Sequence, residues 1–145
     1  MIIFVSDLFA QDYPGGAELT TDAILQDCPV PVLLVRSQQL NAEILTQYKD
    51  WFWIFGNFAD IPAASLIYIS QNLEYTVLEY DYKYCKYRSS EKHENAEGVC
   101  DCALSQQGKS TSIFLANAQN VWFMSHAQRD FYCNLYPFLN KEHIK

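Results

Sequence analysis

The chain has 145 residues and a formal net charge of −7. Half of its residues are apolar, with nine Phe, ten Tyr and three Trp, so the composition excludes a disordered or low-complexity protein. The negative charge disfavours binding to nucleic acid or to an anionic membrane surface. No apolar run reaches the roughly 18 residues that a transmembrane segment needs.

Five short apolar runs alternate with helical patterns along the chain. The runs predict buried parallel strands at residues 2–5, 30–35, 51–55, 75–80 and 121–124. The helical patterns fall at residues 17–26, 41–48, 63–70, 111–118 and 126–135, and we expect Asp60 and Ser125 to cap two of these helices. The alternation predicts an α/β fold with a single domain. We expect a Rossmann-like, doubly wound parallel sheet in a three-layer αβα arrangement.

Residues 81–110 carry no clear period, so we expect a long loop there. In doubly wound sheets, ligands bind beyond the carboxyl ends of the strands. The segments that follow the predicted strands are therefore the places to look for chemistry.

The sequence PGGAE at residues 14–18 follows the first predicted strand. Gly15 and Gly16 allow the backbone to approach a ligand closely, and the helix start behind them favours an anion such as a diphosphate. The alternative is a glycine turn that only starts the helix, with Glu18 favourable in its first turn. The pattern is neither the dinucleotide fingerprint nor a Walker A loop.

The fourth predicted strand leads into EYDYKYCKYR at residues 79–88. Asp81, just past the strand, is a candidate to accept a proton from a hydroxyl group, and so is Glu79 if it turns inward. Lys83, Lys86 and Arg88 add positive charge that would suit a phosphate. The alternative is a solvated loop whose aromatic residues pack on the sheet edge.

Four potential metal ligands lie within 18 residues of one another: Cys85, His93, Cys100 and Cys102. Thiolate and imidazole groups in this number suit tetrahedral zinc, and a metal would fix a loop of unusual length. The spacing matches no standard zinc knuckle. The alternative is unlinked thiols and an exposed histidine, which an odd count of five cysteines also allows. We expect Cys28 and Cys133 to be small apolar fillers.

Ser125 and His126 follow the fifth predicted strand. His126 is a candidate to face the ligand cleft. The alternative is a residue at a helix start that forms only local hydrogen bonds.

The order of these segments resembles the N-terminal, acceptor-side domain of retaining GT-B glycosyltransferases of family four. The resemblance lies in MIIFVSDLF at the N-terminus, GGAE at residues 15–18, IFGNF at 54–58, the segment 75–89 and the segment 117–132. It implies that Gly15 and Gly16 approach the diphosphate of a nucleotide-sugar donor. It also implies that Arg88 and Ser125 line the cleft. Tyr80 stands where the family often has a histidine before the aspartate, which puts that histidine's role in doubt here.

A complete enzyme of this kind has a second, donor-binding domain, which we do not identify in this chain. Residues 140–145 are expected to lead into another element. The isolated domain would then transfer no sugar to its glycan or lipid-linked acceptor, and it would act with a separate donor domain or as a homodimer. The alternatives are a non-enzymatic α/β binding or dimerisation module and, less well supported, a small flavodoxin-like enzyme.

The N-terminal sequence MIIFVSDLFA has no basic segment and no cleavage site of a signal peptide. We therefore expect a cytoplasmic location, with the full-length enzyme able to associate peripherally with the inner membrane.

Overall fold

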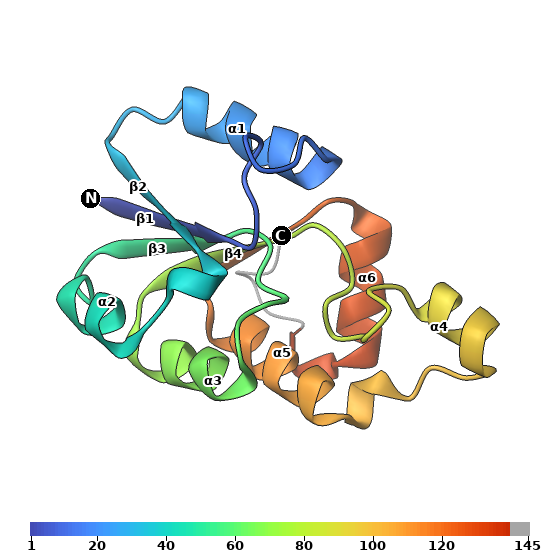
Figure 1. The fold of residues 1–145 in the computed structure, drawn as a ribbon. Helices are drawn as coiled ribbons and strands as arrows, with labels where there is room; N and C mark the ends of the chain where they lie inside the picture. Colours follow the sequence, from blue (N-terminus) through green and yellow to red (C-terminus); the bar gives the residue numbers. More distant parts are fainter. Residues whose placement is uncertain (140–145) are drawn as a thin grey trace.

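The computed structural model describes residues 1–139 and has an α/β architecture (Figure 1). Its five strands are β1 (Ile2–Ser6), β2 (Val32–Arg36), β3 (Phe52–Phe55), β4 (Tyr75–Glu79) and β5 (Asn120–Phe123). They form one sheet in the order β2-β1-β3-β4-β5, and every neighbouring pair is parallel. The predicted Rossmann-like, three-layer fold is therefore confirmed.

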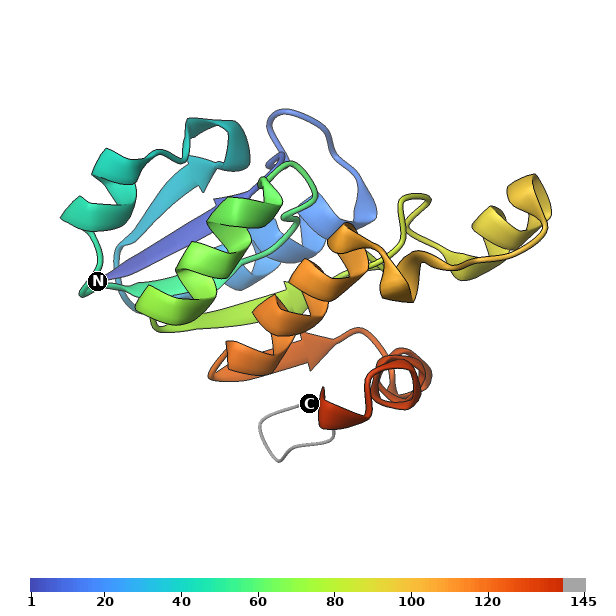
Figure 2. The same cartoon turned by 90° about the horizontal axis from the view of Figure 1, so that it is seen from below.

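Helices cover both faces of the sheet. They are α1 (Gly16–Gln26), α2 (Ala42–Gln47), α3 (Ala63–Asn72), α4 (Ser90–Glu97), α5 (Gln106–Asn117) and α6 (His126–Leu135). Three short 3₁₀ helices complete the set: η1 (Ser37–Gln39), η2 (Cys102–Leu104) and η3 (Pro137–Leu139). Helix α1 lies on one face and α2, α3 and α5 lie on the other (Figures 1 and 2).

The main hydrophobic core lies between the sheet and helices α3 and α5. Tyr75 and Phe114 stack with ring centroids 4.8 Å apart, and Phe55 meets Phe114 edge-on at 5.2 Å. The Tyr75 hydroxyl donates to the Phe114 carbonyl oxygen at 2.5 Å, so the buried polar atom is satisfied. A smaller core, built around Phe4, Phe9 and Leu78, lies apart from it.

Strand β2 is one of the two edge strands, with β5 at the other edge, and it begins at Val32 rather than at residue 30 as predicted. Pro31 precedes it, and proline has no N–H group to donate to a strand ladder. Leu33 and Leu34 are exposed at this edge. By contrast, all five residues of β4 are buried.

Two of the predicted helix starts can be compared with the structure. Ser125 caps α6, because its side chain accepts a hydrogen bond from the Gln128 N–H, as predicted. The prediction for Asp60 is wrong. Helix α3 starts after Pro62 without a side-chain cap. The extended Pro62 separates Asp60 from the helix, and the Asp60 carboxylate accepts from Gln38 instead.

The segment between β4 and α5 is more ordered than the predicted loop. It contains α4 and η2, and α5 starts at Gln106 rather than at residue 111, because Ser105 caps it by accepting from the Gly108 N–H at 3.0 Å. Helix α4 lies beyond the carboxyl end of the sheet and projects from the body of the domain (Figure 2).

Within residues 1–139, no helix combines the length and the apolar character needed to cross a membrane. The predicted lead into another element, at residues 140–145, falls outside the described residues.

Candidate metal centre and ligand cleft

The four predicted metal ligands come together in one group that could hold a metal ion. The ligand atoms of Cys85, His93, Cys100 and Cys102 all lie within 4.8 Å of one another. Cys85, His93 and Cys102 are buried, and Cys100 is partly buried. They come from the loop after β4, from α4, and from the segment that enters η2. The prediction that these residues form one cluster is confirmed.

Three of the separations within the group are close to the edges of a tetrahedral zinc site. Cys85 and Cys100 have their sulphur atoms 3.7 Å apart. The His93 Nδ1 atom lies 3.6 Å from the Cys85 Sγ and 3.4 Å from the Cys102 Sγ. Zinc bonds of about 2.3 Å to sulphur and 2.0–2.1 Å to nitrogen give tetrahedral edges of about 3.8 Å between sulphurs and about 3.5 Å from sulphur to nitrogen. These three separations agree with those values, and all the ligand atoms lie within 4.8 Å of one another.

Local structure explains how α4 presents His93. Ser89 caps the helix through a bond from the Lys92 N–H, and Gly98 ends it in the left-handed region at φ 88°. His93 is the only buried residue of this polar helix. The Tyr87 ring stacks on the imidazole at a centroid distance of 4.8 Å. The helix therefore turns one side chain inward, toward the sulphurs.

Gly108 determines how closely η2, which carries Cys102, can approach α5. A Cβ atom at this position would lie 2.0 Å from the Cys102 carbonyl oxygen, a distance that no packing can relieve. The Tyr136 hydroxyl lies in the same region and is 3.1 Å from the Gly108 oxygen and 3.3 Å from the Ala103 oxygen. The absence of a side chain at residue 108 thus lets η2 pack directly on α5.

The imidazole is held from its other side by Glu97. The His93 Nε2 atom hydrogen-bonds to the Glu97 carboxylate, which also pairs with the Lys86 ammonium group at 3.0 Å. These hydrogen bonds from Lys86, and secondarily from His93, lower the pKa of the Glu97 carboxyl. Neither Glu97 nor Lys86 was singled out as part of the metal site from the sequence. The i,i+4 spacing of His93 and Glu97 would have been the signal, had a helix been expected there.

A second polar cluster lies at the carboxyl end of β4. The Glu79 side chain is wholly buried and pairs with the Lys83 ammonium group at 2.5 Å. It also accepts a hydrogen bond from the Tyr132 hydroxyl at 2.7 Å, and burial raises the pKa of that hydroxyl well above its usual value. Glu79 does turn inward, but its oxygens are bonded within the fold. Its role as a proton acceptor stays a prediction.

Asp81 and Arg88 continue this cluster toward the surface. The Asp81 carboxylate pairs with Lys83 at 3.0 Å and with the Arg88 Nε at 2.6 Å. The Arg88 guanidinium also donates to the Asn57 side-chain oxygen at 3.0 Å. Arg88 has φ 58°, in the left-handed region, and non-glycine residues held there often mark functional sites.

The chain of polar contacts extends to the first helix. The Asn57 amide donates to the buried Glu18 carboxylate at 3.3 Å. Beside it, a Cβ at Gly15 would meet the Glu18 oxygen at 2.4 Å, whereas a Cβ at Gly16 would meet nothing within 4 Å. A side chain at Gly15 would therefore have to displace the ends of the Glu18 and Tyr13 side chains, whereas the space beside Gly16 is open.

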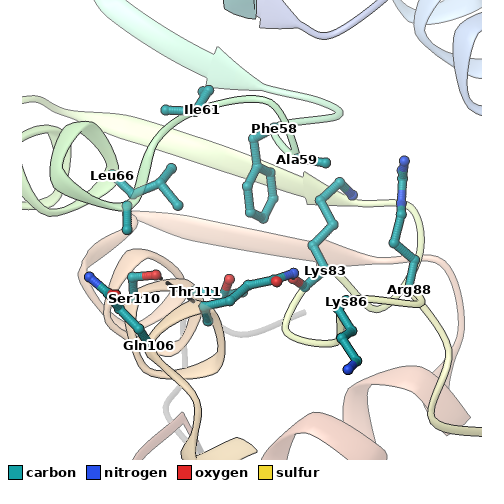
Figure 3. Close-up of a pocket in the computed structure, with 12 residues that line it drawn as sticks. Phe58, Ala59, Ile61, Leu66, Lys83, Lys86, Arg88, Gln106, Ser110 and Thr111 are labelled. Atoms are coloured by element: carbon teal, nitrogen blue, oxygen red, sulfur yellow. Dashed lines mark hydrogen bonds between the residues drawn. The ribbon is translucent and has the colours of Figure 1, made fainter. Parts of the chain in front are cut away.

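A cleft of about 440 Å³ opens next to this network (Figure 3). Its wall includes Phe58, Ile61, Leu66, Lys83, Lys86, Arg88, Gln106, Gln107, Ser110 and Thr111. The Lys83 ammonium group lies 4.8 Å from the centroid of the Phe58 ring. The Lys86 side chain extends away from Lys83 and Arg88 (Figure 3) and toward Glu97. The cleft thus combines an apolar side with amide, hydroxyl and cationic groups.

The remaining predicted site residues lie elsewhere. Ser125 and His126 are exposed at the start of α6 and are not among the residues that line the cleft. The same is true of Gly15 and Gly16. Cys28 and Cys133 are free and partly buried, and the Cys133 side chain packs against the main core.

Comparisons of the chain with protein-family models, with curated protein sequences and with solved structures found no match.

Proposed function

We propose that the domain is the acceptor-side half of a retaining GT-B glycosyltransferase. The observation that supports this proposal is the convergence of the five segments that carry the resemblance. The Arg88 guanidinium joins Asp81 to Asn57, and Asn57 reaches Glu18. The Ser6 hydroxyl accepts from the Asn57 N–H, and the Gln128 amide donates to the Asp81 carbonyl oxygen. Segments far apart in the sequence thus meet at the edge where doubly wound sheets bind ligands.

In this proposal the cleft beside Arg88 takes the acceptor, a hydroxyl-rich glycan or lipid-linked sugar. Gln106 and Gln107 of α5 line the cleft and offer hydrogen-bond partners to sugar hydroxyls, whereas Phe58 borders the cleft with only 1% of its surface exposed. Asp81 lies at the edge of the network and is the candidate to receive the proton of the attacking hydroxyl. The nucleotide-sugar donor is bound together with a donor-binding domain, with Gly16 near its diphosphate. The isolated domain then transfers no sugar.

A binding titration tests this function. Nuclear magnetic resonance spectra of the full 145-residue chain are recorded with millimolar nucleoside diphosphate and, separately, with simple acceptor sugars. We expect weak binding, with shifts confined to the residues around Gly16 and to the cleft. Arg88→Gln weakens the sugar response, while Lys49→Gln, an exposed lysine outside the cleft, serves as the control. Shifts confined to other surfaces, or none, contradict the proposal. A stable dimer without any sugar or nucleotide response would favour the binding-module alternative.

We further propose that Cys85, His93, Cys100 and Cys102 hold a structural zinc ion. Three soft thiolates and one imidazole form a closed ligand set with no position left for a substrate, which is typical of structural zinc. The three separations between ligand atoms that match a zinc tetrahedron support this assignment. The ion would fix the segment between β4 and α5, whose helix α4 buries only His93.

Metal analysis of the full chain tests the zinc site. We expect one zinc per chain after purification without chelator. Cys102→Ser should lose stoichiometric zinc, while Cys28→Ser and Cys133→Ser should keep it, because those cysteines lie outside the cluster. A chain that contains no zinc and takes up none when the metal is supplied would contradict the assignment. So would a Cys85–Cys100 disulfide in the freshly reduced protein.

A further inference from the structure

Glu97 stands between the metal cluster and the wall of the cleft. One of its carboxylate oxygens hydrogen-bonds to the His93 Nε2. The carboxylate also meets the Lys86 ammonium group, at 3.2 Å from one oxygen and 3.0 Å from the other. Lys86 follows the ligand Cys85 directly and contributes to the cleft wall.

The two nitrogens of His93 face different partners. Nδ1 points to the sulphurs of Cys85 and Cys102, whereas Nε2 points to Glu97. An imidazole that ligates through Nδ1 carries its proton on Nε2 and can donate it to the carboxylate. Such a carboxylate fixes the tautomer and the ring orientation and makes the ligating nitrogen more basic. Glu97 is in the position to do this here.

The positive charge of Lys86 beside Glu97 offsets negative charge that would gather at the metal centre. A zinc dication bound by three thiolates and a neutral imidazole has one net negative charge. The Glu97 carboxylate next to it adds another, in a chain that is already acidic. The Lys86 ammonium group offsets this accumulation within hydrogen-bond distance of Glu97, although the pair is about half exposed, at 54% and 43%.

We propose that Glu97 is a positioning residue of the metal centre and that Lys86 acts on the metal through Glu97. This inference rests on the proposed zinc site and deepens it. Glu97 holds the His93 ring in the ligating tautomer, and Lys86 holds the carboxylate in place and balances its charge. Metal affinity therefore depends on two residues that do not touch the metal.

The first experiment compares zinc affinities of the full chain by competition with a chromogenic chelator. We expect Glu97→Gln to weaken zinc binding about 10–100-fold, the usual effect of removing such a partner. Glu97→Asp should recover part of the loss. Glu94→Gln, an exposed glutamate on the same helix, is the matched control. Cobalt-substituted Glu97→Gln should keep the thiolate charge-transfer bands while its ligand-field bands shift, because the sulphur ligands remain and the imidazole changes.

The second experiment is a double-mutant cycle. We expect Lys86→Gln alone to weaken zinc binding about threefold, as for an exposed ion pair, and to have no further effect in the Glu97→Gln background. Lys49→Gln is the control for the loss of one positive charge. Additive effects of the two substitutions would overturn the proposed order of action. Zinc affinity of Glu97→Gln within twofold of the unmodified chain would overturn the inference while leaving the zinc site intact. An unmodified chain that binds no zinc would instead overturn the zinc site and, with it, this inference.

Discussion

The sheet and the segment between β4 and α5 differ in the chemistry of their buried side chains. Around the sheet, the largest fully buried side chains are aromatic and aliphatic, among them Trp53, Tyr75, Phe55 and Phe114. In residues 81–105, the buried side chains are Lys83, Tyr84, Cys85, His93 and Cys102. The first region gains stability mainly from apolar area removed from water.

The second region also contributes Tyr84, Cys85 and Cys102 to the main core, but it buries the polar Lys83 and His93 as well. Its helix α4 buries only one residue, and isolated helices of this length are unstable in water. We expect ion pairs and the proposed metal ion to add to the order of this helix. The comparison contrasts an apolar core with a segment whose order, under the proposed zinc site, depends in part on ligand chemistry. The first two of the following predictions separate the two regions, and the other two test buried charged groups.

Metal removal should have the largest effect and should act on one region alone. We expect a chelator to abolish amide-exchange protection between residues 83 and 105, because the cluster joins three separate parts of that segment. Amides of β1, β3 and β4 should keep their protection. Hydrogen exchange with mass spectrometry measures both regions in one experiment. Simultaneous loss of protection in the sheet would contradict the separation.

Phe114→Ala should act on the core instead. The ring is fully buried and contacts Phe55, Phe58 and Tyr75, so its removal should cost about 3–5 kcal/mol of unfolding free energy. Zinc stoichiometry should stay at one per chain under conditions where the variant is folded. Urea denaturation measures the unfolding free energy of the variant, and metal analysis measures its zinc stoichiometry. Loss of zinc from the folded variant would show that the regions are not independent.

Lys83→Met tests the charge cluster that lies where the two regions meet. Without the ammonium group, the buried Glu79 carboxylate loses its ion-pair partner, which should cost about 3 kcal/mol or more. Adding Glu79→Gln to this variant should restore much of the stability, since the uncompensated charge is then gone. Urea denaturation of the single and double variants measures the difference. If the single and the double variant were equally stable, the unpaired Glu79 carboxylate would not be the reason why Lys83→Met destabilises the fold.

The smallest predicted effect concerns Asp7, which directly follows β1 at the carboxyl end of the strand. Burial raises the pKa of its carboxyl above 3.8, although hydrogen bonds from the Asp60 and Ala59 amides oppose this. A carboxyl with a raised pKa in the folded state binds its proton more tightly there than when unfolded. The unmodified chain should therefore lose stability relative to Asp7→Asn as pH rises from about 3.8 through the folded pKa. A stability difference between the two proteins that does not change between pH 3 and 6 would contradict the shift.

The sequence predicted the fold because its strands are continuous apolar runs with helical patterns between them. It also identified the four clustered ligands, because cysteine and histidine are uncommon and chemically specific. Helix α4 could not be predicted, since it has no apolar period and turns only His93 inward. The contact between Glu97 and His93 could not be predicted for the same reason, because it depends on α4. Asn57 joins Glu18 to Arg88 across long stretches of chain, and such contacts follow from strand order rather than from local pattern.

X-ray absorption at the zinc edge, on the full chain purified without chelator, tests the central claim most directly. The account predicts a first shell of three sulphur atoms at about 2.3 Å and one nitrogen at about 2.0–2.1 Å. A shell made only of nitrogen and oxygen atoms, or the absence of bound zinc, would contradict it.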